Sequence, residues 1–160
     1  MITYYRVDQR IIHGQTCMVL IKQYPCDGIL IVNDEVANDP FLKNIFKGIA
    51  PSGIKVLAYT VEKAMTKLIE AQESEKNYFV IFKHVDAVKQ MVEGGYKFTG
   101  KLYLGTQHAR DNTKLIDNGL YLTDQEVEMV DYIASEGVEI VVNPLIDHEP
   151  KPWREVRKAA

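Results

Sequence analysis

The chain has 160 residues, of which 46% are hydrophobic and 26% are charged, as is typical of a soluble globular domain. Its 19 basic and 22 acidic residues give a net charge of −3. This balance argues against a nucleic-acid-binding surface, because phosphate recognition needs clustered Lys and Arg. We expect one domain over residues 1–160 and no nucleic-acid partner.

Two cysteines, Cys17 and Cys26, are too few for a disulfide framework, and they form no CxxC pair. We therefore expect reduced thiols. Residues 1–6 lack the basic and apolar segments of an export signal, and no apolar run approaches 18 residues. We expect a cytoplasmic protein without a membrane-spanning segment.

Short runs of β-branched and aromatic residues that are apolar on both faces are typical of buried parallel strands. Four runs have this character: residues 29–32, 54–58, 78–82 and 138–142. Residues 2–7 alternate weakly and are rich in Tyr, Ile and Val, and we expect them to form a buried parallel strand as well. A shorter strand is expected at residues 102–104, with a polar loop after it. Residues 120–122 are a candidate antiparallel edge strand.

Segments with the helical period lie between these strands. Apolar residues recur at i, i+3 and i+4 in residues 61–69, and Thr60 is placed to cap the first turn. Residues 123–126 have a capping-box pattern, and the helix they start ends before Gly137. Residues 39–48 open with Asp-Pro, which supplies a cap and a first-turn proline.

Strands that alternate with helices of this length predict right-handed crossovers. The fold class is therefore α/β, with an open and mainly parallel sheet that has helices on both faces. In such folds the functional crevice lies beyond the carboxyl ends of the strands. The loops after the strands are the places to look for chemistry.

The loop after the first strand carries Asp8, Arg10 and His13 within six residues, followed by Gly14. An imidazole can act as a neutral nucleophile near pH 7 and can attack phosphorus. The phosphohistidine so formed would carry close to two negative charges, which Arg10 and the backbone N–H groups after Gly14 would neutralise. Asp8 can orient either Arg10 or the imidazole. The alternative is that His13 only packs at the strand-to-helix junction, beside a solvated Asp8–Arg10 ion pair.

The loop after the second strand, residues 33–40, is acidic. Its carboxylates suggest a divalent metal, but the loop lacks the glycine and the ligand spacing of an EF-hand. We expect Asp39 to cap a helix, and Asn33 and Asp34 to shape the crevice.

Other motifs are weaker. Residues 95–101 match Gly-x-x-x-x-Gly-Lys, but Leu102 follows where a phosphate-binding loop needs Ser or Thr, so a helix-to-strand turn is expected. His84 and His108 follow strands and are interpreted as polar loop residues, whereas His148 lies outside any clear element.

No zinc-ligand spacing and no Gly-x-Ser-x-Gly elbow is present. Residues 152–158 either touch a membrane surface as a basic helix or, as we expect, dock through Trp153.

Four motifs in one order resemble the enzyme IIB component of the mannose/fructose/sorbose family of the bacterial phosphotransferase system. They lie at residues 7–15, 31–39, 50–56 and 61–64. Residues 136–139 and the Asn-Pro pair at 143–144 are similar to the closing strand of that family. The resemblance covers nearly the whole chain.

The resemblance implies a phosphocarrier of the protein-N(π)-phosphohistidine–sugar phosphotransferase class. In the family, the histidine matching His13 takes a phosphoryl group from a phosphohistidine on a IIA component. It then passes the group to a sugar held by the membrane components IIC and IID, which implies a location at the inner face of the membrane. No metal, nucleotide or other cofactor is implied, and a homodimer is a candidate assembly.

Carried over by position, Asp8 and Arg10 support the histidine. Gly14 and Gln15 supply loop backbone, and Asn33 and Asp34 form the neighbouring wall. The family precedent favours phosphorylation at Nδ1.

Two departures from the family bear on specificity. Residues 105–108 read Gly-Thr-Gln-His where many relatives have a glycine-rich turn, and the first helix lacks a tryptophan often found there. The sugar therefore stays unassigned. A regulatory or binding module with a phosphorylatable His13 is the alternative function, and a hydrolase on the same scaffold is a weaker one.

Overall fold

The structure, a computed structural model, describes residues 1–159. The strands are β1 (Ile2–Val7), β2 (Gly28–Val32), β3 (Lys55–Tyr59), β4 (Tyr78–Phe82), β5 (Leu102–Leu104), β6 (Thr113–Asp117), β7 (Leu120–Thr123), β8 (Ile140–Val142) and β9 (Lys151–Pro152). The helices are α1 (Gly14–Gln23), α2 (Asp34–Ala37), α3 (Pro40–Ile49), α4 (Val61–Glu73), α5 (Val85–Glu93), α6 (Asp124–Ser135) and α7 (Trp153–Ala159).

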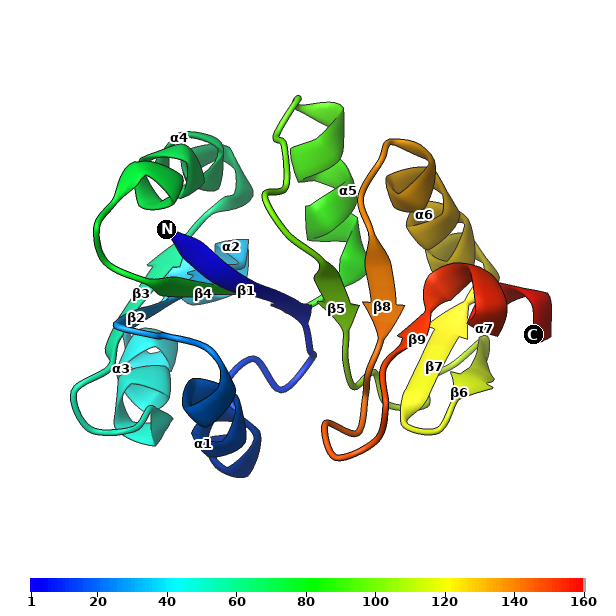
Figure 1. Ribbon diagram of the computed structural model, residues 1–160, viewed down its shortest axis with the longest axis horizontal. Helices are drawn as coiled ribbons and strands as arrows, with labels where there is room; N and C mark the ends of the chain where they lie inside the picture. Colours follow the sequence, from blue (N-terminus) through cyan, green and yellow to red (C-terminus); the bar gives the residue numbers. More distant parts are fainter. Residues whose placement is uncertain (160) are drawn as a thin grey trace.

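The main sheet has seven strands in the order β3-β2-β4-β1-β5-β8-β9. All of its pairings are parallel except that of the short edge strand β9 with β8. Helices α1 and α3 lie on one side of this sheet, and α4, α5 and α6 lie on the other (Figure 1). The expected α/β class, with a mainly parallel sheet between helices, is confirmed.

The core lies on both faces of the sheet, which explains why the strands are apolar on both sides. Along β1, Tyr5 packs with the residues under α4, α5 and α6, while Tyr4 packs with those under α1 and α3. Each side chain of this size contributes roughly 1.5–3 kcal/mol when it leaves water. The sheet is thus held between two apolar layers, and its carboxyl edge is left for the loops.

The expected helix starts are confirmed by their caps. The Thr60 hydroxyl accepts a hydrogen bond from the Lys63 N–H at the start of α4. Thr123 and Glu126 form both halves of a capping box on α6. Asp39 accepts from two backbone N–H groups at the start of α3.

The segment after β5, residues 105–123, differs from the sequence expectation. The antiparallel strand expected at residues 120–122 exists as β7, but it pairs with β6 in a separate two-stranded sheet and is not an edge of the main sheet. The reason is that Leu120 and Leu122 are fully buried and pack into the core. The polar strand β6 was expected to be loop.

The remaining differences are small. Strand β8 begins at Ile140 and not at Val138, because the chain still completes the end of α6 through Gly137, whose φ is +96°. Residues 95–101 join α5 to β5, as expected for a helix-to-strand turn. The docking of α7 is also confirmed: Trp153 is buried and its indole N–H donates to Asp131 at 2.8 Å.

Candidate functional site

The loop of residues 8–13 joins the carboxyl end of β1, a central strand of the sheet, to helix α1. Strand β1 pairs with β4 on one side and with β5 on the other. The helix after β1 covers one face, whereas α5, which follows β4, covers the opposite face (Figure 1). Ligand sites in open α/β sheets form at such a switch point, beyond the carboxyl ends of the strands.

Two buried isoleucines hold this loop in shape. Ile11 and Ile12 are 6% and 5% exposed, while His13 beside them is exposed. Ile11 has φ +62°, a left-handed conformation that costs a β-branched residue about 1–2 kcal/mol. Burial of both side chains offsets this strain and fixes the loop. His13, the next residue, lies on the exposed side of the loop.

Asp8 is the centre of a buried ion cluster. Its carboxylate accepts from Arg10 Nε at 3.0 Å and from Arg10 Nη2 at 2.8 Å, and it also accepts from the Arg10 backbone N–H. From the other side Arg6 Nε donates to Asp8 Oδ2 at 3.1 Å. The sequence left open whether Asp8 orients Arg10 or the imidazole, and in the structure its side-chain partners are the two arginines.

The electrostatics of this cluster favour the charged forms of Asp8 and Arg10. Burial alone would raise the pKa of Asp8, but the hydrogen bonds from Arg10 and the charges of Arg6 and Arg10 outweigh it and hold that pKa below its ordinary value. The hydrogen bond to Asp8 likewise raises the pKa of Arg10. Two guanidinium groups against one carboxylate leave an excess positive charge beside the loop.

Arg6 was not among the expected site residues. Its side chain is 2% exposed, and besides Asp8 it donates to the Tyr4 hydroxyl at 3.2 Å and to the Pro144 carbonyl at 3.5 Å. The only local signal for it is Asp8, two residues further along the alternation of β1, because Arg10 lies in the turn that follows the strand. A buried charge is retained only when it is paired in this way.

Gly105 provides the room for Arg6. A Cβ built at Gly105 would lie 2.7 Å from both Arg6 Cζ and Arg6 Nε, and 2.6 Å from the Val7 carbonyl oxygen. Backbone and a buried guanidinium cannot both move away, so a side chain at this position forces the cluster apart.

We therefore expect Gly105→Ala to lower the free energy of unfolding by about 1–3 kcal/mol, the usual cost of overpacking. Gly100→Ala is the matched control, because a Cβ there meets nothing within 4 Å. Urea unfolding of the two variants measures the difference. Equal unfolding midpoints would contradict this expectation, because they would show that Arg6 can make room for a Cβ at residue 105 without loss of stability.

His13 begins helix α1, as its N-cap residue. Its ring Nδ1 lies 3.3 Å from the Thr16 hydroxyl, in the first turn of that helix. The first turn holds no acidic residue, so its free N–H groups and the helix dipole present positive potential to an anion there. Gly14 has open space around it, since a Cβ would meet nothing within 4 Å, and Gln15 is exposed.

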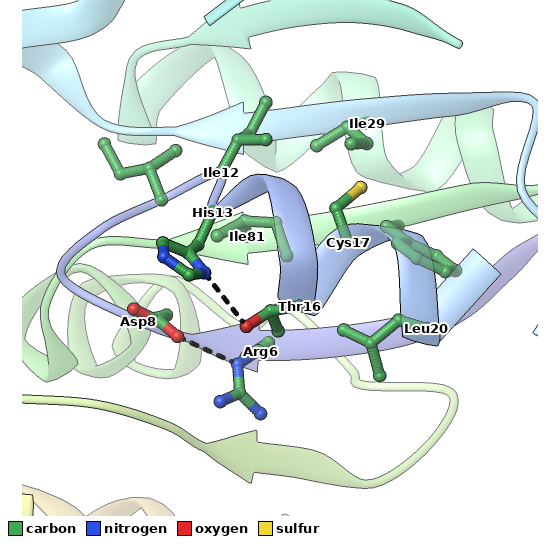
Figure 2. A pocket seen from close by; sticks show the side chains of 11 residues that line it. Arg6, Asp8, Ile12, His13, Thr16, Cys17, Leu20, Ile29 and Ile81 are labelled. Atoms are coloured by element: carbon green, nitrogen blue, oxygen red, sulfur yellow. Dashed lines mark hydrogen bonds and ion pairs between the residues drawn. The ribbon is translucent and has the colours of Figure 1, made fainter. Parts of the chain in front are cut away.

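A small hollow opens beside the imidazole. Arg6, Asp8, His13 and Thr16 gather around it (Figure 2). The rest of its wall is mostly apolar and comes from α1, β2 and β4, with Cys17, Leu20, Ile29, Phe79 and Ile81 among the lining residues. The hollow thus has one polar side, where Arg6 and Asp8 are paired, and one apolar side, and Arg10 is not among the residues that line it.

Asn33 and Asp34 lie at the carboxyl end of β2 and not in the lining of this hollow. The Asn33 side chain accepts from the Val36 N–H, capping α2. Asp34 Oδ1 accepts from the Val61 N–H at 2.8 Å, which ties α2 to the start of α4. Both side chains therefore hold the loop after β2 in place.

A network that was not expected joins the loops after β1, β4 and β5. Gln107 is 1% exposed; its amide nitrogen donates to the Lys83 carbonyl at 2.8 Å, and its amide oxygen lies 3.1 Å from His84 Nδ1. Gln9 accepts from the His108 backbone N–H. His84 therefore contributes Nδ1 to a structural contact, and the imidazole of His13 is the one that lines the charged hollow.

The part of the chain that the structure describes has neither a metal-binding cluster of side chains nor a membrane-spanning helix. Within residues 1–159, no group of three or more His, Cys, Asp or Glu residues is arranged to hold a metal ion. Over the same residues, none of the helices has both the length and the apolar character needed to cross a membrane.

A family model agrees with the motifs of the sequence. The model described as "PTS system sorbose subfamily IIB component" matches residues 2–160. The sorbose-specific EIIB component of Lacticaseibacillus casei is 31% identical over 139 residues, which are 87% of this chain and 84% of that protein.

Two further similarities extend the comparison. The mannose-specific EIIAB component of Escherichia coli K12 is 26% identical over 146 residues, and the chain spans only 45% of the length of that relative. The crystal structure of the IIBSor domain of the sorbose permease from Klebsiella pneumoniae superposes with a TM-score of 0.89 at 26% identity, over 100% of this chain and 98% of that one.

Proposed function

Because the chain belongs to the family of sorbose-subfamily IIB components of the phosphotransferase system, we propose that it is a phosphocarrier. In this proposal His13 accepts a phosphoryl group from a phosphohistidine of a IIA partner and passes it to a sugar held by membrane components IIC and IID. The sugar is a small molecule that presents a hydroxyl group. The protein works in the cytoplasm, held to the inner face of the membrane by IIC and IID.

The observation that carries the proposal is an exposed imidazole at the start of a helix, next to a cluster with one more guanidinium than carboxylate. A phosphoryl group in flight carries negative charge on its equatorial oxygens, and catalysis of its transfer is mostly positioning and charge stabilisation. Arg10 and the N–H groups that follow His13 supply that stabilisation. Asp8 fixes the position of Arg10, and Arg6 holds Asp8 from the other side.

The transfer exchanges one P–N bond for another. The lone pair of His13 Nδ1 attacks phosphorus while the P–N bond to the donor imidazole breaks, and that electron pair returns to the donor ring. In the second step a sugar hydroxyl oxygen attacks phosphorus, the P–N bond to His13 breaks, and the hydroxyl proton goes to the departing imidazole. No nucleotide or metal is required by this balance.

The contact with Thr16 supports Nδ1 as the reacting nitrogen. The Thr16 hydroxyl lies 3.3 Å from Nδ1, so this nitrogen faces the first turn of α1. Once phosphorus is bound there, the same hydroxyl and the backbone N–H groups of Gly14 and Gln15 can donate to the phosphoryl oxygens. Asn33 and Asp34 are given the indirect role of shaping the neighbouring wall.

The experiment that tests this function follows a labelled phosphoryl group. The chain is incubated with the general phosphotransfer proteins, a IIA partner and a labelled phosphoryl donor, and then with sugar and membranes that contain IIC and IID. We expect an acid-labile, alkali-stable label that is discharged when sugar is added. Absence of any label would refute the phosphocarrier function, and a label that no sugar discharges would favour a regulatory module.

A further inference from the structure

The charged side chains of helices α1 and α3 are all basic, although α2, which packs on the same side of the sheet through Val36, adds Asp34 and Glu35. Helices α1 and α3 together contain three lysines, Lys22, Lys43 and Lys47, and no acidic residue. On the other face, α4 contributes three acidic residues, α5 two and α6 four, against three basic residues in all. Within residues 1–159 none of the three lysines on α1 and α3 takes part in an ion pair. On a chain with net charge −3, these lysines make the surface of α1 and α3 a candidate contact for an acidic partner.

The same face exposes apolar side chains. Phe41, Ile45 and Ile49 recur once per turn along α3, and Phe41 is 72% exposed. On α1, Met18 and Val19 are 46% and 41% exposed. We call these five residues, together with the three lysines, the α1–α3 face. Exposed large apolar residues that gather in this way typically mark interaction sites.

The α1–α3 face begins at the nucleophile. His13 is the N-cap of α1, and Met18 and Val19 lie about one and a half turns further along the helix. The chain leaves the carboxyl end of β2, the same edge of the sheet from which His13 projects, and passes through the short helix α2 before α3 starts. A protein that brings a phosphoryl group to His13 must therefore cover the ground next to this face.

We propose that the α1–α3 face is the docking surface for the phospho-IIA donor. The exposed apolar residues and lysines of this face would bind a donor that has an apolar surface with acidic residues around it, next to the donor histidine. This inference rests on the proposed function and adds the surface through which the partner is chosen. The apolar stripe of α3 supplies affinity, and the lysines set orientation and association rate.

Two other occupants fit less well. A second copy placed symmetrically on the α1–α3 face would oppose lysines to lysines. An anionic bilayer could contact the lysines but has no phosphohistidine to present to His13, which lies at the start of α1.

The test separates docking from chemistry. The rate of His13 phosphorylation is measured against the concentration of a phospho-IIA protein that labels the wild-type chain, and separately with phosphoramidate, a small donor that needs no docking. We expect Phe41→Ala and Lys47→Glu each to raise KM for phospho-IIA about tenfold, and to leave the rate with phosphoramidate unchanged. The KM of the wild type should also rise with salt.

Matched controls come from the acidic face. Ile69→Ala removes a side chain that is 48% exposed on α4, and Lys63→Glu reverses an exposed charge on the same helix. Neither should change KM. If the α3 variants keep the wild-type KM, the docking surface is wrong although the phosphocarrier function stands.

A wild type that reacts with phosphoramidate and with no phospho-IIA would instead refute the proposed function itself. Binding to vesicles of phosphatidylglycerol that is lost in Phe41→Ala, with KM unchanged, would assign the α1–α3 face to the membrane and overturn the proposal.

Discussion

Replacing His13 with alanine is expected to abolish uptake of the phosphoryl group, with a loss on the order of 10³-fold or more in the rate of labelling. No other side chain takes over, because His84 is held by Gln107 through Nδ1 and the His13 imidazole is the one beside the guanidinium cluster. The measurement is acid-labile label per chain after incubation with phospho-IIA.

Folding should not obscure this result. His13 is exposed and makes no side-chain capping bond to α1, so the alanine variant should unfold at the wild-type urea concentration. The matched controls His84→Ala and His108→Ala should take up label at the wild-type rate. A His13→Ala chain that still becomes labelled would assign the nucleophile elsewhere.

Replacing Asp8 with asparagine is expected to have the largest effect on stability. The substitution leaves Arg6 buried beside Arg10 without the carboxylate that both contact. Breaking a buried ion cluster in this way costs about 3–5 kcal/mol. Urea unfolding at pH 7 measures the loss, with Asp111→Asn as control because Asp111 is exposed.

The effect of Asp8 should depend on pH with a definite sign. The pKa of Asp8 is lower in the folded chain than its ordinary value, so its contribution is fully present above about pH 4, the range of an unperturbed aspartate. It is lost as the pH falls through the lowered folded pKa. The gap between wild type and Asp8→Asn should therefore shrink below pH 4, and a gap that stays constant down to pH 2 would contradict the assigned cluster.

The residue pattern predicted most of the sheet because strands such as β2, β4 and β8 are almost entirely buried on both faces. The run at residues 2–7 matches β1, and the run at 102–104 matches β5. Strand β6 was missed because its residues are polar and largely exposed, so no apolar alternation marks it. Helix α2 has four residues, too few for a helical period to show.

The sequence predicted the site residues of the loop after β1, but it did not predict the buried residues that hold this loop in place. Asp8, Arg10 and His13 stood out because they are polar and follow a buried strand. Arg6 did not, because an arginine inside a strand is normally exposed, and its burial depends on Gly105 and Pro144, which lie about 100 or more positions away. Such contacts are set by the parallel pairing of β1, β5 and β8, which local sequence does not encode.

The most direct test of the account is the location of the phosphoryl group on the labelled wild-type chain. Nitrogen-15 NMR of the phosphorylated protein, read together with peptide mapping, identifies both the residue and the ring nitrogen. We predict a single phosphoryl group on Nδ1 of His13. A phosphoryl group on His84, on His108 or on no histidine would contradict the account.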